Sequence, residues 1–103
     1  MAQVGEVILC RVLGSAVASR KDPALLGAKL LIAVEAEPDG GEREDLHVLA
    51  DTLGAGTGDL VLVVIGSGAR LTAETRGQPL DALVVAIVDT VEQDGAVVYG
   101  GAP

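Results

Sequence analysis

The sequence predicts a small all-β domain, and three observations lead to that class. Short runs of Val, Ile, Leu and Ala recur along 103 residues, separated by turn-forming Gly, Pro and Asp. Tyr99 is the only aromatic residue, so the core is expected to consist of aliphatic side chains on closely packed strands. No repeat or linker divides the chain, so residues 1–103 are expected to form a single domain. Five or six short strands favour a closed barrel or a sandwich, because closure removes exposed sheet edges.

The first half of the chain contains three of these strands. The first is expected over residues 4–18, bent at Gly14, where glycine permits a bulge. A second strand is expected over residues 28–34, and a short third strand over residues 46–50. The acidic stretch 35–45 between them contains Pro and two Gly residues and is expected to be an exposed loop.

A glycine-rich turn at 54–58 opens the fourth strand, 59–65, and is the most informative part of the chain. Loops that cradle phosphate follow a strand and open a helix, whereas this one opens a strand and lacks the P-loop lysine. The pattern therefore favours a turn with positive φ at several positions over a nucleotide site.

The last third of the chain contains a predicted cap, a strand and a hairpin. Ser67 is expected to cap a short helical turn, and it lacks the glycines two residues before and two residues after it that a nucleophile elbow requires. Residues 81–91 are almost wholly apolar from 82 to 88, as expected for a strand with one face on the core and the other on a neighbouring subunit. The turn 92–95 contains an Asp-Gly pair, so residues 96–99 are expected to pair back as a final strand.

Composition argues against several classes of function. The formal charge of −8 disfavours nucleic acid and anionic membranes, and no apolar run is long enough for a membrane helix. Cys10 is expected to be a small buried hydrophobe. His47 is the only histidine, so it has no partner for a metal site or a catalytic triad. Residues 1–15 do not resemble a signal peptide. We therefore predict a cytoplasmic protein that is not an enzyme and holds no cofactor or metal.

Several motifs, in order, carry a resemblance to a known family. They are S-R-K-D-P at 19–23, L-G-A-K-L-L at 26–31, D-T-L-G-A-G-T-G-D at 51–59, G-S-G-A-R at 66–70, and P-L-D-A leading to A-I-V-D at 79–89. Together they cover most of residues 5–92, and they resemble the vertex proteins of bacterial microcompartments, the small shell proteins of carboxysomes and metabolosomes. One departure is Gly68, where that family commonly has a second serine.

The resemblance implies an OB-like closed barrel of five to six strands with one short helix. It also implies a homopentamer that occupies the fivefold vertices of a polyhedral shell beside hexameric shell proteins, with no chemistry of its own. The alternative class is a small OB-like module that binds an unidentified ligand, although such modules use aromatic and basic side chains that are scarce here.

Three groups of residues are candidates for roles in such an assembly. The glycine loop is expected near the fivefold axis, where large side chains would collide; it consists of Gly54, Ala55, Gly56, Thr57 and Gly58. The subunit interface is expected to include Ser67 and to pair Arg70 with a neighbour's carboxylate, either Asp81 or Asp51. The shell contact is expected in a charged turn held by Pro23, and it consists of Arg20, Lys21 and Asp22.

Overall fold

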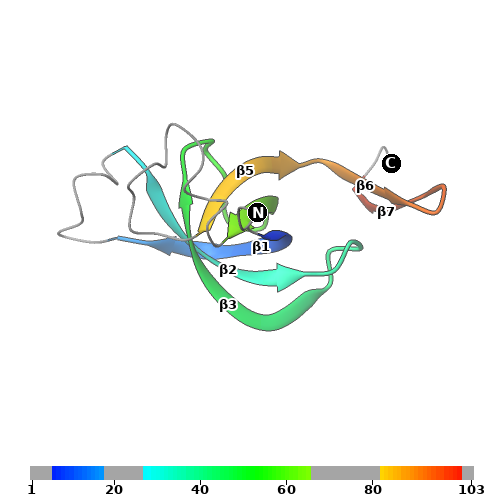
Figure 1. Cartoon of the computed structure of the whole chain (residues 1–103), viewed down its shortest axis with the longest axis horizontal. Helices are drawn as coiled ribbons and strands as arrows, with labels where there is room; N and C mark the ends of the chain where they lie inside the picture. Colours follow the sequence, from blue (N-terminus) through cyan, green and yellow to red (C-terminus); the bar gives the residue numbers. More distant parts are fainter. Residues whose placement is uncertain (1–5, 18–26, 66–81, 101–103) are drawn as a thin grey trace, which may run out of the picture.

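The computed structural model describes residues 6–17, 27–65 and 82–100, and within these ranges every regular element is a strand (Figure 1). The strands are β1 Glu6–Ala16, β2 Lys29–Ala36, β3 Glu42–Asp51, β4 Leu60–Ile65, β5 Ala82–Val88, β6 Thr90–Gln93 and β7 Ala96–Gly100. The all-β prediction is confirmed. The helical turn expected after Ser67 lies outside the described residues and stays a prediction.

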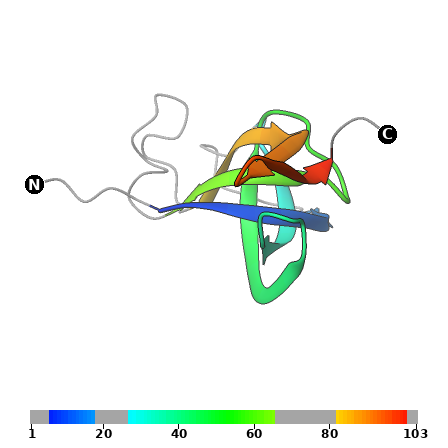
Figure 2. The ribbon, with the colours of Figure 1, turned by 90° about the vertical axis from the view of Figure 1, so that its right-hand side faces the viewer.

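Five of the strands form a closed barrel in the order β1-β2-β3-β5-β4. Neighbouring strands are antiparallel except β3 and β5, which run parallel and meet at Ala50 and Leu83. Figure 2 shows β1, β4 and β5 lying one above another in that pairing order. Each barrel strand therefore has a neighbour on both sides, although β3 and β5 share only the single pair Ala50 and Leu83.

The long first strand serves two neighbours because it bends. Its first half, Glu6 to Arg11, pairs with β4, and its second half, Cys10 to Ala16, pairs with β2. The register shifts between Val12 and Gly14, which is the signature of a β-bulge. The bend predicted at Gly14 is thus confirmed.

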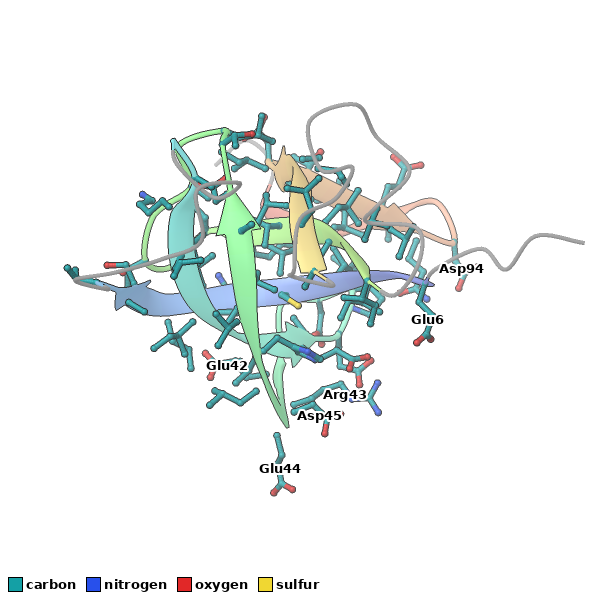
Figure 3. All side chains as sticks on the ribbon, turned by 60° about the vertical axis from the view of Figure 1, so that its left-hand side comes forward. Glu6, Glu42, Arg43, Glu44, Asp45 and Asp94 are labelled. Carbon is teal, nitrogen blue, oxygen red and sulfur yellow. The ribbon has the colours of Figure 1, made fainter. Side chains whose placement is uncertain are left out.

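Two differences from the predicted strands have physical causes. Strand β3 begins at Glu42, whereas residues 42–45 were expected in a loop, because a pair between Ala36 and Glu42 extends the ladder beyond a register shift. The charged side chains at this end of β3 are exposed, and Figure 3 shows them around the start of the strand. A strand that faces water in this way has the composition of a loop.

The second difference is a division of the strand expected over residues 81–91. It separates at Asp89 into β5 and β6, which raises the number of strands above the expected five or six. Strands β6 and β7 form the predicted hairpin, and its turn residues Asp94 and Gly95 both have positive φ, 54° and 81°, as a type I′ turn requires. Figure 1 shows this hairpin beyond the end of β5.

The barrel interior is aliphatic, as the composition predicted. Its buried cluster consists of Cys10, Val12, Leu31, Ala33, Leu49, Ala55, Val61, Val63, Ala82 and Val84. The side chain of Cys10 is fully buried, which confirms its predicted role as a small core residue.

Cys10 makes stability depend on pH in the alkaline range. Burial, with a smaller effect of the Glu35 carboxylate, raises the pKa of the Cys10 thiol from 9.0 to about 11. Between these values the unfolded chain has lost the thiol proton and the folded chain has kept it, so stability falls as the pH rises. The loss should reach about 3 kcal/mol at most.

Urea unfolding at about pH 8 and about pH 10.5 measures this loss. Cys10→Ala has no thiol, so it should lose less free energy of unfolding between these two pH values than the unsubstituted protein. The lysines and the tyrosine contribute equally to the loss in both proteins. An equal alkaline loss in the two proteins would contradict the prediction.

Candidate functional site

The glycine loop between β3 and β4 is anchored at its start by one buried carboxylate. Asp51, the last residue of β3, is only 2% exposed. Its Oδ1 accepts a hydrogen bond from the Leu53 amide at 2.9 Å, and its Oδ2 accepts one from the Ala55 amide at 2.8 Å. An aspartate that accepts from amides two and four residues later closes a local turn, so Asp51 fixes the path of the chain into the loop.

A second carboxylate closes the other end of the loop. Asp59 Oδ2 accepts from the Gly56 amide at 2.8 Å, and the Asp59 amide donates to the Gly56 carbonyl at 3.0 Å. The loop is also joined to β1, because the Gly58 amide donates to the Val12 carbonyl and the Val12 amide donates to the Asp59 carbonyl. The last part of the loop is therefore attached at the bulge of the first strand.

Two cationic side chains hold carbonyl groups of the same loop. Lys29 Nζ donates to the Ala55 carbonyl at 2.6 Å, and Arg11 Nη1 donates to the Gly58 carbonyl at 2.7 Å. Gly54 and Gly58 have φ of +88° and +92°, which confirms the expectation of positive φ at several positions in the turn. Carboxylates on the amides and cations on the carbonyls give the loop a defined shape within one chain.

The loop residues that are expected near the fivefold axis differ in their exposure, and their placement at the axis stays a prediction. The Ala55 side chain is fully buried and belongs to the barrel core. The amides of Ala55, Gly56 and Gly58 already donate within the chain. The side chain of Thr57 is exposed and remains available. A phosphate would also find these three amides engaged, in agreement with the turn interpretation.

The other candidate residues have different outcomes. Asp51 lies in the described part, where its carboxylate holds the loop, and its pairing with a neighbour's arginine stays a prediction. The remaining interface and shell-contact candidates lie outside the described residues; they are Ser67, Arg70, Asp81, Arg20, Lys21 and Asp22.

Sequence reasoning missed the roles of Arg11, Lys29 and Asp59. An aspartate on each side of a glycine run, as in D-T-L-G-A-G-T-G-D, was an available local signal for two carboxylates that accept from loop amides. Arg11 and Lys29 lie 47 and 26 residues from the carbonyls that they bind, so no local pattern indicates them.

Arg43 forms ion pairs with acidic side chains at one end of β2 and β3, and His47 lies beside them. Arg43 lies 3.5 Å from a Glu35 oxygen and 3.6 Å from a Glu37 oxygen, and His47 Nε2 lies 4.0 Å from Glu35. In residues 6–17, 27–65 and 82–100 no group of three His, Cys, Asp or Glu side chains is arranged to hold a metal ion. No helix in these ranges is long and apolar enough to span a membrane.

The chain is similar to known proteins in family, sequence and structure. The family model described as "Ethanolamine utilisation protein EutN/carboxysome" matches residues 7–89. The carboxysome shell vertex protein CcmL of Thermosynechococcus vestitus is 41% identical over 91 residues, which cover 88% of this chain and 92% of that protein. The bacterial microcompartment shell vertex protein EutN of Escherichia coli is 36% identical over 91 residues, covering 88% and 96%.

Solved structures give the same result. CcmL of Nostoc sp. PCC 7120 superimposes with a TM-score of 0.82 at 36% identity, covering 91% of this chain and 99% of that one. The GrpN pentameric microcompartment shell protein of Rhodospirillum rubrum gives 0.73 at 38% identity, covering 84% and 98%. The ordered motifs, the fold and these matches agree, and the chain belongs to the EutN/carboxysome family of microcompartment shell vertex proteins.

Proposed function

We propose that this chain is a structural shell protein whose homopentamers cap the fivefold vertices of a bacterial microcompartment. The observation that carries the proposal is the identity of 36–41% with proteins named as shell vertex proteins, over nearly their whole length. The pentameric GrpN structure supports the ring of five. A closed ring uses a heterologous interface whose rotation completes a circle.

Exposed apolar side chains on the single chain support association with further copies. On β3, Leu46 and Val48 are 63% and 49% exposed, and on β5, Val85 and Ile87 are also exposed. Valine, leucine and isoleucine in such numbers on strand surfaces are typical of an interaction face. The prediction that β5 presents one face to a neighbouring subunit is consistent with this exposure. We further propose that Arg70 pairs across the interface, preferably with Asp81, because the oxygens of Asp51 already accept loop amides.

We place the exposed part of the glycine loop, Thr57 above all, near the fivefold axis of the ring. Five copies of a loop that meet around an axis leave little room for a large side chain. Thr57→Trp should therefore raise the pentamer dissociation constant by about tenfold or more, which corresponds to about 1.4 kcal/mol. Each chain should stay folded, because the Thr57 side chain is exposed in the single subunit.

Native mass spectrometry across a dilution series measures this effect. Thr90→Trp is the matched control, since Thr90 is also exposed but lies at the start of the β6–β7 hairpin. An unchanged pentamer dissociation constant in Thr57→Trp would contradict the placement of the glycine loop near the axis.

The proposed partners are hexameric shell proteins. Hexagonal units alone tile a plane, so a closed shell requires pentagonal units at its vertices. The charged turn of Arg20, Lys21 and Asp22 is the proposed edge contact. Each contact can be weak, because a pentamer meets its surroundings through five equivalent edges at once and multivalency multiplies the effect.

Co-expression tests the function as a whole. The cognate hexameric shell proteins are produced with and without this chain, and the products are examined by electron microscopy and by an antibody access assay for an enclosed protein. We expect sheets, tubes or leaky shells without the chain and closed particles with it. Sealed, closed particles in both samples would refute the proposed function.

A further inference from the structure

One guanidinium group joins three segments that are far apart in the sequence. Arg11 Nη1 donates to the Gly58 carbonyl of the glycine loop at 2.7 Å, and Nη2 donates to the Gly40 carbonyl of the β2–β3 turn at 2.9 Å. The guanidinium carbon lies 5.3 Å from the centroid of the Tyr99 ring on β7, and Nη1 lies 3.5 Å from the Tyr99 hydroxyl. Arg11 therefore contacts the loop, the turn and the hairpin at once.

The hairpin depends on such a contact for a fixed direction. Strands β6 and β7 pair with each other and form a sheet separate from the barrel. A two-stranded hairpin is marginally stable in water unless it packs against something else. Figure 1 shows it extending away from the barrel at the end of β5. The cation–π contact of Tyr99 with Arg11, a residue of a barrel strand, connects the two sheets.

The turn at Gly40 is shaped to let the guanidinium and the ring meet. Gly40 has φ of +88°, and a Cβ atom there would lie 2.6 Å from Arg11 Nη2 and 2.8 Å from Tyr99 Cδ1. The turn is closed by bonds from the Gly40 amide to the Glu37 carbonyl and from the Glu37 amide to the Gly41 carbonyl, both 2.8 Å. Its path is therefore fixed, with the Gly40 carbonyl directed at Arg11.

We propose that Arg11 is a positioning residue that couples the β6–β7 hairpin to the glycine loop, so that a change at the hairpin is transmitted to Gly58. The planar guanidinium offers separate donors to two carbonyls while its face stacks on a ring, and a lysine ammonium cannot do all three. In the proposed homopentamer, the direction of the hairpin and the shape of the glycine loop are then set together. That extension rests on the proposed function, whereas the coupling within one chain does not.

Amide hydrogen exchange tests the coupling. Tyr99→Ala removes the ring from the guanidinium and should speed exchange of the Gly58 amide by about tenfold, although Tyr99 lies on β7 and Gly58 lies in the loop between β3 and β4. Val97→Ala is the matched control, because Val97 lies on the same strand with its side chain exposed; it should leave Gly58 unchanged. Circular dichroism verifies that each variant keeps its strands.

The double variant separates coupling from a merely structural effect. Arg11→Lys should speed exchange at both the loop and the hairpin, and in that background Tyr99→Ala should add less than about twofold at Gly58. Additive effects of the two substitutions, or a Tyr99→Ala effect confined to the hairpin, would overturn the inference. If native mass spectrometry finds no pentamer while the coupling is present, the proposed function fails and the inference stands. If a pentamer forms without the coupling, the inference fails and the proposed function stands.

Discussion

Asp51→Ala is expected to lower the free energy of unfolding by about 3 kcal/mol, because two amides lose a charged acceptor inside the protein. Asp51 is nearly fully buried, and its two oxygens are the acceptors for the Leu53 and Ala55 amides. Alanine offers no replacement, and the Ala55 amide lies in the interior where water cannot take over the bond. The loss should appear as an earlier midpoint in urea unfolding at one fixed chain concentration, since association also affects the midpoint.

The chain contains a matched control for this substitution. Asp39 makes the same kind of local bond, in which its Oδ1 accepts from the Gly41 amide two residues later, but at an exposed position. Asp39→Ala should therefore cost less than about 1 kcal/mol. If both variants lose the same free energy of unfolding, the burial of Asp51 does not determine its contribution to stability. A loss in Asp51→Ala that is smaller than the Asp39→Ala loss would contradict the assigned role of Asp51.

The elements predicted from sequence are those with local causes. Gly14 is the one glycine within β1, and the bulge occurs there because glycine tolerates the backbone of a bulge. Asp94 and Gly95 both adopt positive φ in a two-residue turn, which is a property of the residue types themselves. The strand runs were visible because barrel strands that are largely buried are almost continuously apolar.

The features missed from sequence depend on contacts between distant residues. The start of β3 is charged because it lies at an exposed end of the sheet, and only its pairing with Ala36 reveals a strand. Arg11 and Tyr99 are 88 residues apart, and neither is unusual in its local setting. Ala55 stands between two glycines in a loop, and nothing in that pattern indicates that its methyl group enters the core. Tertiary packing determines all three.

The burial of Ala55 leads to an expected result that differs from that of its neighbour Thr57. Ala55→Trp places an indole where the side chain is fully buried, in the core cluster that also contains Leu49 and Val63. A filled core cannot accept that volume without displacing strands, which costs about 3 kcal/mol or more. The buried Ala55 amide bond to Asp51 would also be disturbed, because it fixes the same residue.

Ala55→Trp should therefore unfold the chain or lower its thermal midpoint sharply, whereas Thr57→Trp should yield a folded chain that assembles poorly. Circular dichroism melting reports the first effect and native mass spectrometry the second, so the two measurements assign each loop position to the core or to the assembly. Ala55→Ser, which is close in size, should fold and form rings, and it shows that volume is the cause. A folded Ala55→Trp chain with a normal melting curve would mean that the side chain at position 55 can leave the core. Position 55 would then be a candidate, with Thr57, for lining the fivefold axis.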